Sequence, residues 1–309
     1  MIRARGPLAL RALVTVLVLA WLGSRLDPAG VVEAVTRIDG AVWALLALVT
    51  AADRGLATAR WLLLVRASGF DLPVRSGARL FLVSSFLGSF LPAGVGGDIA
   101  RTWELATRTG RTGRAVAVAA ADRWLGLASV LALGAAGLVL VDGLPIDPRL
   151  AGAVYVLLGV VLLAGFAGRL AERIAAAVLP ARWAAAAAAV TGAVRQFLGR
   201  RAAVGLVVGL SFAAQVVRVL LAWLIGVGLA IDIPLSYYFV VMPIGIVLIL
   251  LPISVAGLGP AQGAVMWMLR PAGVPDELSF AMSTLFVLLG VAGNLPGAVL
   301  FLRSRHRAP

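Results

Sequence analysis

The sequence contains no cysteine and no lysine, and its single histidine, His306, lies in the polar C-terminal tail. Without cysteine the chain can form no disulfide, no thiolate nucleophile and no cysteine-based metal site. A histidine-based active site inside a membrane is excluded as well. The sequence also lacks a Walker or other nucleotide-binding motif, and we expect neither a metal nor a cofactor.

Charged residues make up only 13% of the chain, about half of the ~25% that soluble domains carry, whereas 61% of the residues are hydrophobic. Uncharged runs of about 18 or more residues indicate membrane spans. Trp124 to Val141, Ile233 to Leu269 and Leu278 to Leu302 are such runs. These features predict an all-α polytopic membrane protein that forms one integral membrane domain over residues 1–309.

All 27 basic residues are arginine, but the net charge of +13 does not indicate a nucleic-acid partner, because the arginines are distributed by membrane side. With the N-terminus in the cytoplasm, only Arg25, Arg37, Arg149 and Arg270 lie outside, which satisfies the positive-inside rule. We therefore expect a multi-pass protein of the cytoplasmic (inner) membrane with both termini in the cytoplasm. The six expected full spans cover about residues 8–23, 41–65, 115–141, 150–167, 202–230 and 278–302.

Two further apolar stretches do not fit this set of spans. The stretch 80–97 lies between two arginine-bearing segments that both belong on the cytoplasmic side, and it is too short to cross twice. It therefore predicts a re-entrant hairpin over residues 80–104. The run 233–269 fits either a second re-entrant hairpin, over 233–270, or two full helices, which would give up to eight spans. Charge does not separate these alternatives, because both end on the same side.

The two apolar stretches contain the same sequence frame, LPxxVxG, at residues 91–97 and again at residues 251–257. Three expected crossings separate the two copies, so the hairpins would enter from opposite faces. This arrangement predicts an inverted repeat with halves 1–141 and 202–302. The connector 168–201 is rich in alanine and arginine and predicts a cytoplasmic amphipathic helix on the anionic inner leaflet, or a plain linker helix.

Broken hydrophobic segments at corresponding positions of two halves indicate the binding site of a transporter. Proline removes a backbone donor and glycine allows close approach, while the helix after each break would direct its positive end toward an anionic group such as phosphate. An ordinary turn between two helices is the alternative. The candidate binding residues at the breaks are Pro92, Gly94, Gly96, Gly97, Pro252, Ser254, Gly257 and Gly259. Gln262 and Asn294 are polar candidates of lower weight, for which hydrogen bonding between helices is the alternative.

Ionisable residues inside the expected spans are a second signal, because charges in a membrane are costly and usually functional. Arg218 is the strongest candidate, since its own span holds no acid, and its partner must be another part of the protein or a lipid phosphate. The other candidates are Asp122 and Arg123, for which snorkelling of the arginine to the headgroups is an alternative. We expect Arg60 to snorkel in this way.

Asp98 and Arg101 follow the first break directly. Asp98 could be the N-cap of the next helix, a role that is compatible with ligand binding. Arg101 lies three residues on and shares the same helix face. The alternative is a salt-bridge ladder at the cytoplasmic surface.

Four segments together resemble the flippase-like family of lysylphosphatidylglycerol synthase transmembrane regions: SSFLGSFLPAGVGGDIARTWELA, DRWLGL, LPISVAGLGPAQGAVMWML and GNLPGAVLFL. They occur in the family's order over about residues 8–302. In that family the domain is associated with moving lipids or lipid-linked sugars between leaflets. The resemblance implies as motif positions Pro92, Gly94, Gly97, Asp98, Arg101, Asp122, Arg123, Pro252, Gly257 and Gly259.

Two departures from the family pattern limit what it implies. Ala261 and Gln262 stand where the family usually has a charged pair, so an acid/base or ion-coupling role is not expected there. The aminoacyl-transferase domain of the bifunctional members is absent, so we do not expect lysyl transfer.

Three functions fit these observations. The first is a lipid translocase that moves an anionic phospholipid or a polyprenyl-linked lipid between leaflets, without nucleotide hydrolysis. The second is a non-catalytic membrane partner of a glycosyltransferase or lipid synthase. The partners that we expect are membrane lipids with an anionic headgroup, and either further copies of this chain or a lipid-synthesis or glycosyltransferase protein. The third is a membrane-embedded lipid-phosphate enzyme, which is disfavoured because no span carries a cluster of metal ligands or a nucleophile with its base.

Overall fold

The computed structural model describes residues 20–21, 24, 26–89, 95–140, 147–166, 194–250 and 258–305, with isolated positions between 173 and 192. The expected first span and most of the connector 168–201 lie outside this set. Residues 91–94 of the first LPxxVxG motif and all of the second motif, residues 251–257, lie outside it as well. The candidates that fall outside the described residues are Pro92, Gly94, Pro252, Ser254 and Gly257.

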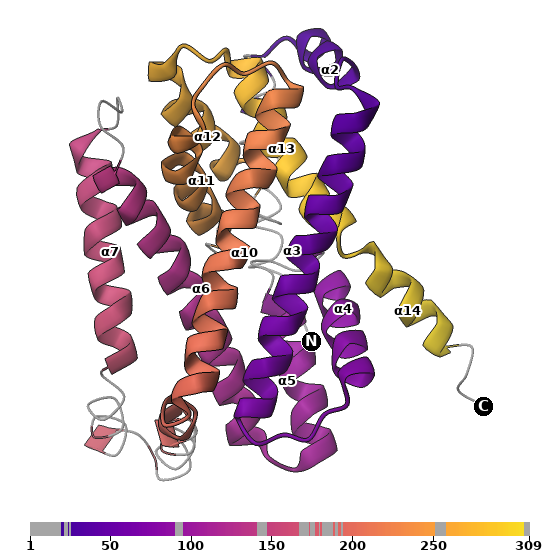
Figure 1. The fold of residues 1–309 in the computed structure, drawn as a ribbon, viewed down its shortest axis with the longest axis vertical. Coiled ribbons are helices and arrows are strands. Elements are labelled where there is room, and N and C mark those ends of the chain that lie inside the picture. Colours follow the sequence, from indigo (N-terminus) through magenta and orange to yellow (C-terminus); the bar gives the residue numbers. More distant parts are fainter. Residues whose placement is uncertain are drawn as a thin grey trace.

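Every regular element in the described part of the chain is a helix (Figure 1). The elements are α2 (Pro28–Thr36), α3 (Gly40–Ala67), α4 (Val74–Ser89), α5 (Val95–Thr109), α6 (Thr112–Leu140), α7 (Pro148–Phe166), α10 (Arg201–Gly228), α11 (Leu235–Leu250), α12 (Pro260–Leu269), the 3-10 turn η2 (Arg270–Ala272), α13 (Asp276–Ala292) and α14 (Leu295–Arg305).

Within the described residues, four segments are long and apolar enough to cross a membrane: Gly40–Ala67, Thr112–Leu140, Arg201–Gly228 and Asp276–Arg303. They agree with four of the expected spans to within a few residues. The helix α7 is a shorter apolar helix at the position of another. The expected all-α polytopic membrane architecture is therefore confirmed.

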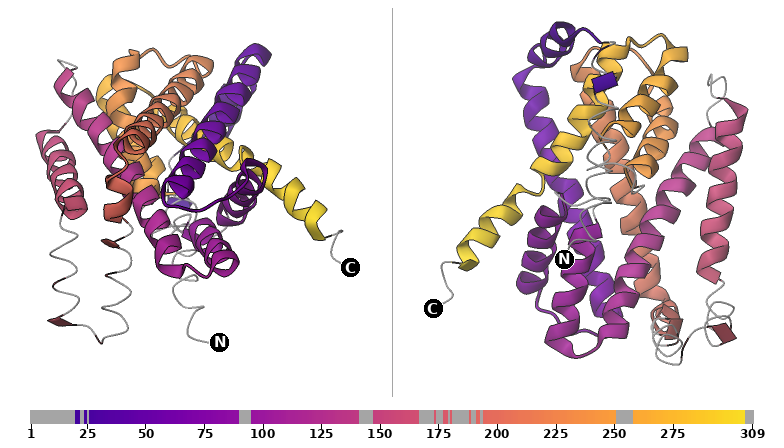
Figure 2. Two further views of the ribbon diagram at one scale, coloured as in Figure 1. Left: turned by 60° about the horizontal axis from the view of Figure 1, so that its bottom comes forward. Right: turned by 180° about the vertical axis from the view of Figure 1, so that it is seen from behind.

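The last span differs from the expectation, because it is not one continuous helix. It breaks at Gly293 and Asn294, between α13 and α14. Pro296 lies in the first turn of α14 and has no N–H to donate to the carbonyl of Ala292, the last residue of α13. The helix α14 departs from the direction of α13 and packs against α4. Figure 2 shows that only its C-terminal end projects beyond the other helices.

The described helices follow the same order twice: α3, α4, α5 and α6, and then α10, α11, α12 and α13. In Figure 1, α3 descends and α10 rises beside it, and the two pack extensively. The pair α4 and α5 lies at the lower end of the molecule, whereas α11 and α12 lie at the upper end. The two halves are therefore antiparallel, as the inverted-repeat interpretation requires.

The short helices of the two pairs are too short to cross a membrane alone. α4 has 16 residues, or about 24 Å, against a hydrocarbon core of about 30 Å. α12 has only 10 residues, or about 15 Å. The hairpin over residues 233–270 stays a prediction, because residues 251–257, which join α11 to α12, lie outside the described part of the chain. The first pair is longer than the expected 80–104, because α4 begins at Val74 and α5 ends at Thr109.

Glycines set the closest contacts within and between these helices. A Cβ atom on Gly97 of α5 would lie 2.6 Å from the carbonyl oxygen of Ser84 in α4. A Cβ atom on Gly137 of α6 would lie 2.9 Å from the carbonyl oxygen of Phe239 in α11. Only glycine permits such backbone approaches. These contacts bring α5 against α4 and α6 against α11 at positions where no side chain fits.

Candidate functional site

A cavity of about 350 Å³ lies at the centre of the molecule, between the two halves. One wall is polar and is formed by α3, α5, α6 and α10. A second wall is apolar and is formed by Ile246 and Ile249 of α11 and by Phe286, Val287 and Val291 of α13, while α4 adds Phe81, Ser85, Gly88 and Ser89 to the lining. The cavity is thus amphipathic, with charged groups facing hydrocarbon side chains.

Three of the helices that form the polar wall carry their polar residues at the same spacing along the sequence. Residues at positions i, i+4 and i+7 lie on one face of a helix. Each of α3, α6 and α10 carries polar or small residues at this spacing. These stripes are Asp53, Ala57 and Arg60 on α3; Asp122, Gly126 and Ser129 on α6; and Ser211, Gln215 and Arg218 on α10.

Asp53 is the acid that pairs with Arg218. The carboxylate Oδ1 accepts a hydrogen bond from Arg218 Nε at 2.8 Å, and Oδ2 accepts one from Arg54 Nε at 2.9 Å. Only 4% of the Asp53 side chain is exposed. The partner that Arg218 requires from outside its own span is therefore Asp53, which lies 165 positions earlier in the chain.

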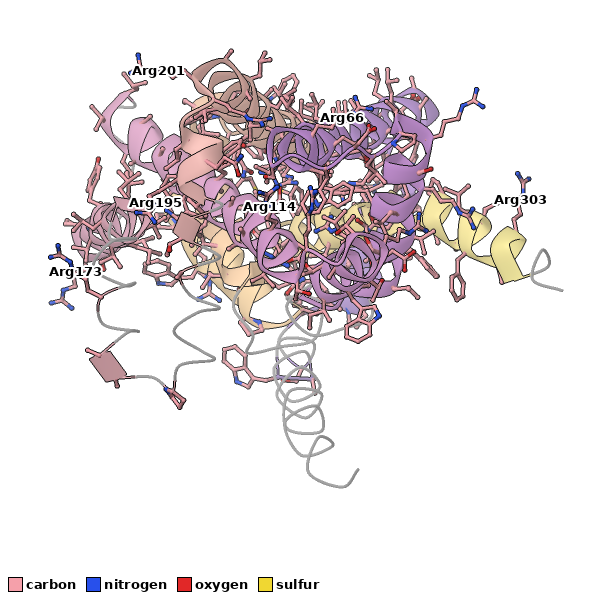
Figure 3. All side chains as sticks on the ribbon, turned by 90° about the horizontal axis from the view of Figure 1, so that it is seen from below. Arg66, Arg114, Arg173, Arg195, Arg201 and Arg303 are labelled. Carbon is pink, nitrogen blue, oxygen red and sulfur yellow. The ribbon has the colours of Figure 1, made fainter. Side chains whose placement is uncertain are left out.

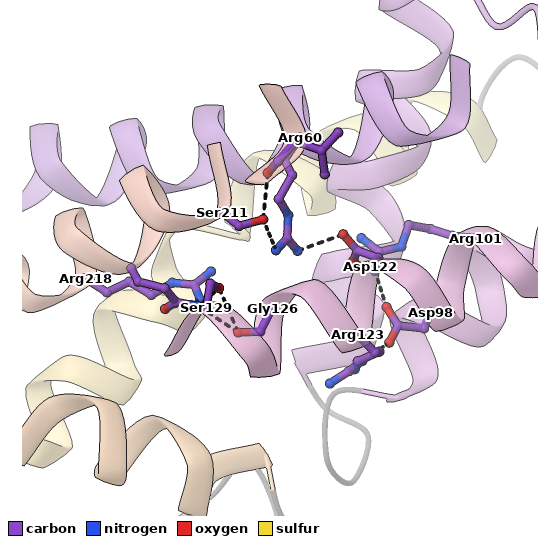
Figure 4. Close-up of polar contacts among 11 residues, drawn as sticks. Arg60, Asp98, Arg101, Asp122, Arg123, Gly126, Ser129, Ser211 and Arg218 are labelled. Atoms are coloured by element: carbon purple, nitrogen blue, oxygen red, sulfur yellow. Dashed lines mark hydrogen bonds and ion pairs between the residues drawn. The ribbon is translucent and has the colours of Figure 1, made fainter. Parts of the chain in front are cut away.

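Asp98, on α5 at the lower end of the molecule in Figure 1, and Asp122 of α6 form a second charged group, which is called the lower group and is shown in Figure 4. Arg60 Nη2 lies 2.7 Å from Asp122 Oδ1, and Arg101 Nη2 lies 3.9 Å from Asp122 Oδ2. Asp98 pairs with Arg101 through Oδ1 and with Arg123 through Oδ2. The guanidinium of Arg101 also lies over the ring of Phe81, 4.6 Å from its centroid, in cation–π geometry.

Two expectations for these residues are wrong. Arg60 does not snorkel: it points into the protein, is 13% exposed and pairs with Asp122. Asp98 is not an N-cap, because α5 begins three residues before it, at Val95, and its carboxylate binds arginines instead. The alternative of a surface salt-bridge ladder also fails, since the Asp98 and Arg101 side chains are only 13% and 10% exposed.

Neutral polar side chains extend the network of charges. Gln215 Nε2 donates to the carbonyl of Gly126 at 3.1 Å and to Ser129 Oγ at 3.3 Å, while its Oε1 accepts from Arg218 Nη1 at 3.3 Å. These bonds hold α6 and α10 together along the polar wall. They also fix the orientation of Arg218.

Asn294, a polar candidate of lower weight, lines the cavity, and so does Arg54, which was not among the binding candidates. Arg54 Nη1 donates to Asn294 Oδ1 at 3.1 Å, and Asn294 Nδ2 donates to Ser89 Oγ at 2.8 Å. Asn294 occupies the break between α13 and α14 and thereby connects α3 with the end of α4. The signal in the sequence was an asparagine beside glycine and proline inside an apolar run.

The described residues near the second motif have a local structural role. Gly259 adopts φ +98°, a conformation that favours glycine, and its N–H donates to Gln262 Oε1 at 2.6 Å. Gln262 is fully buried and caps α12. The Gln262 side chain thus folds back onto the start of its own helix. Gly259, Gln262 and the candidate Gly96 do not line the cavity.

The cavity brings together Gly97, Asp98, Arg101, Asp122, Arg123 and Arg218 from the candidate set. In the part of the chain that the structure describes, no group of three or more histidine, cysteine, aspartate or glutamate side chains is arranged to hold a metal ion. The arrangement is suited to binding an anion, since guanidinium groups form bidentate bonds with phosphate.

Comparison with known families decides the relationship. Residues 8–297 match the family model described as the lysylphosphatidylglycerol synthase TM region. The chain belongs to this family. The match covers every residue of the cavity, and it relates this multi-pass membrane protein to lipid handling. The region that defines the family is the membrane part of the synthases and not their catalytic part. A search among curated proteins returned no match.

Proposed function

We propose that the protein is a lipid translocase, without enzymatic activity, that moves an anionic phospholipid or a polyprenyl-linked lipid between the leaflets of the cytoplasmic membrane. The observation that carries this proposal is the central cavity, with arginines on one wall and apolar side chains on the other. A lipid presents the same two chemistries, a charged headgroup and hydrocarbon chains. The family relationship supports the same conclusion.

In this mechanism the headgroup phosphate enters the polar wall and shares the guanidinium groups with the aspartates that hold them in place. Arg101 and Arg218 are already oriented by their carboxylates, so little side-chain order has to be created when the phosphate binds. The acyl chains remain along the apolar wall and in the surrounding lipid. The opposed helix pairs α4–α5 and α11–α12 open the cavity alternately to the two leaflets.

The orientation that we propose places the lower end of Figure 1 in the cytoplasm. Arg66 lies in the last turn of α3, Arg114 lies in the first turn of α6, and Arg201 begins α10. Figure 3 shows them from below, together with Arg173, Arg195 and Arg303. The upper end carries acidic residues, among them Glu33, Asp232 and Asp276. This asymmetry supports the positive-inside orientation.

Labelling of single cysteines tests the orientation, because the chain has no cysteine of its own. The exposed residues Thr36 and Thr109 are the last residues of α2 and α5, which lie at opposite ends of the molecule. An impermeant maleimide added to intact cells is expected to label Thr36→Cys, and to label Thr109→Cys only after permeabilisation. The reverse pattern would contradict the proposed orientation.

Reconstitution tests the proposed function. Purified protein in liposomes is expected to move fluorescent phosphatidylglycerol to the outer leaflet, where dithionite quenches it, beyond the fraction quenched in protein-free liposomes. Fluorescent polyprenyl phosphate forms the second arm, and each lipid is tested with and without a proton gradient. If quenching stays at the protein-free level for both lipids under all conditions, the chain does not translocate them.

A further inference from the structure

We infer that the cavity selects headgroups that are anionic and carry no amine, and that it discriminates against aminoacylated lipids. This inference specifies the substrate class of the proposed translocase and rests on that function. It follows from how the three aspartates of the central network are paired.

Every aspartate of the network faces two different arginines, one at each carboxylate oxygen. Asp53 binds Arg218 through Oδ1 and Arg54 through Oδ2. The two carboxylates of the lower group are engaged in the same way. Asp98 binds Arg101 and Arg123, and Asp122 faces Arg60 and Arg101. Each carboxylate in the described wall therefore lies within ion-pair distance of two arginines, although Asp122 makes no hydrogen bond through Oδ1 and its Oδ2 is 3.9 Å from Arg101. An ammonium group would have to compete with these arginines for a carboxylate.

The guanidinium groups, by contrast, are in excess. The charged residues of the network are five arginines, at positions 54, 60, 101, 123 and 218, and three aspartates, at positions 53, 98 and 122, which leaves a formal charge of +2. Arg60 Nε is buried and has no hydrogen-bond partner in the described structure. The network therefore has N–H donors and positive charge to offer, and both suit a phosphate.

Binding of a lipid whose headgroup carries amines to this wall is expected to be weakened by repulsion between like charges. Lysylphosphatidylglycerol has one phosphate charge and two ammonium groups, so its net charge has the same sign as that of the cavity. Bringing like charges together in a partly buried site is costly. Phosphatidylglycerol has the same glycerophosphate and acyl chains without the amines, which makes the two lipids a matched pair.

Equilibrium binding to the purified full chain in detergent tests the inference, with short-chain phosphatidylglycerol and short-chain lysylphosphatidylglycerol as the titrants. We expect phosphatidylglycerol to bind at least about tenfold more tightly, a difference of about 1.4 kcal/mol. Arg218→Gln, which lowers the cavity charge, is expected to reduce this ratio. Arg270→Gln removes an exposed arginine that pairs with Asp276 outside the cavity, and it is expected to leave the ratio unchanged.

The outcomes separate this inference from the proposed function. If lysylphosphatidylglycerol binds as tightly as phosphatidylglycerol or more tightly, the selectivity is wrong even when leaflet exchange is observed. If phosphatidylglycerol is preferred but neither it nor polyprenyl phosphate is exchanged in liposomes, the selectivity stands and translocation fails. An equal loss of the ratio in Arg218→Gln and Arg270→Gln would overturn the assignment of selectivity to the cavity.

Discussion

Asp53→Ala is expected to destabilise the protein by about 3–5 kcal/mol, because it leaves two arginines without their buried partner. Asp53 is 3% exposed and binds both Arg54 and Arg218. Removing it also releases the orientation of Arg218, so leaflet exchange should be lost. The free energy of unfolding in detergent, measured by denaturant titration, checks the first effect, and the liposome assay checks the second.

The matched control is Glu33→Ala. Glu33 also pairs with an arginine, Arg37, but both side chains are largely exposed, at 61% and 75%. An exposed pair of this kind contributes about 0–1 kcal/mol. A second variant, Asp53→Asn, keeps the shape of the side chain and removes only its charge. If Asp53→Ala and Asp53→Asn are as stable as Glu33→Ala, the central ion pairs do not support the fold.

Gly97→Ala is the second change with a large expected effect. The added Cβ atom would lie 2.6 Å from the backbone carbonyl oxygen of Ser84, so α4 and α5 must separate. Overpacking of this kind costs about 1–3 kcal/mol. Because Gly97 and Asp98 are consecutive cavity residues, the shift also moves Asp98 away from Arg123. Exchange should therefore fall at least about tenfold, since a lost charged hydrogen bond costs about 1.5–3 kcal/mol.

Gly209→Ala on α10 is the control for Gly97→Ala, because a Cβ atom there meets no other atom within 4 Å. Alanine in the middle of a helix is more stable than glycine by roughly 0.5–1 kcal/mol, so this variant is expected to be slightly stabilised and fully active. Equal stability and equal exchange in Gly97→Ala and Gly209→Ala would show that the close contact between α4 and α5 is unimportant.

Much of the fold could be predicted from the sequence, because membrane spans follow from apolar length. That Arg218 has a partner outside its own span could be predicted as well, because a buried cation with no acid in its span needs one from elsewhere. The identity of that partner was not, because nothing in the spacing relates Asp53 to Arg218 across 165 positions. The same holds for Arg60, whose position near a helix end suggested the lipid surface and not Asp122.

The features that could not be predicted depend on packing between helices. The apolar run from Leu278 to Leu302 is long enough for one span. Its glycine, asparagine and proline hint at a break, but only the packing of the helices shows that Asn294 binds Arg54 and Ser89. Asp98 looked like a cap because it follows a proline and glycines. Its actual role depends on Arg123, which comes from a different helix.

The central claim is that the cavity arginines carry the headgroup, and Arg101→Gln compared with Arg108→Gln tests it most directly. Both arginines lie on α5, but Arg101 lines the cavity, whereas Arg108 is 57% exposed and pairs with Glu104. In Arg101→Gln, Asp98 keeps Arg123 and Asp122 keeps Arg60, so the fold should persist. The measurement is the initial rate of phosphatidylglycerol exchange in liposomes that contain equal amounts of folded protein. We predict a fall of at least about tenfold for Arg101→Gln and the wild-type rate for Arg108→Gln; equal rates in the two variants would contradict the claim.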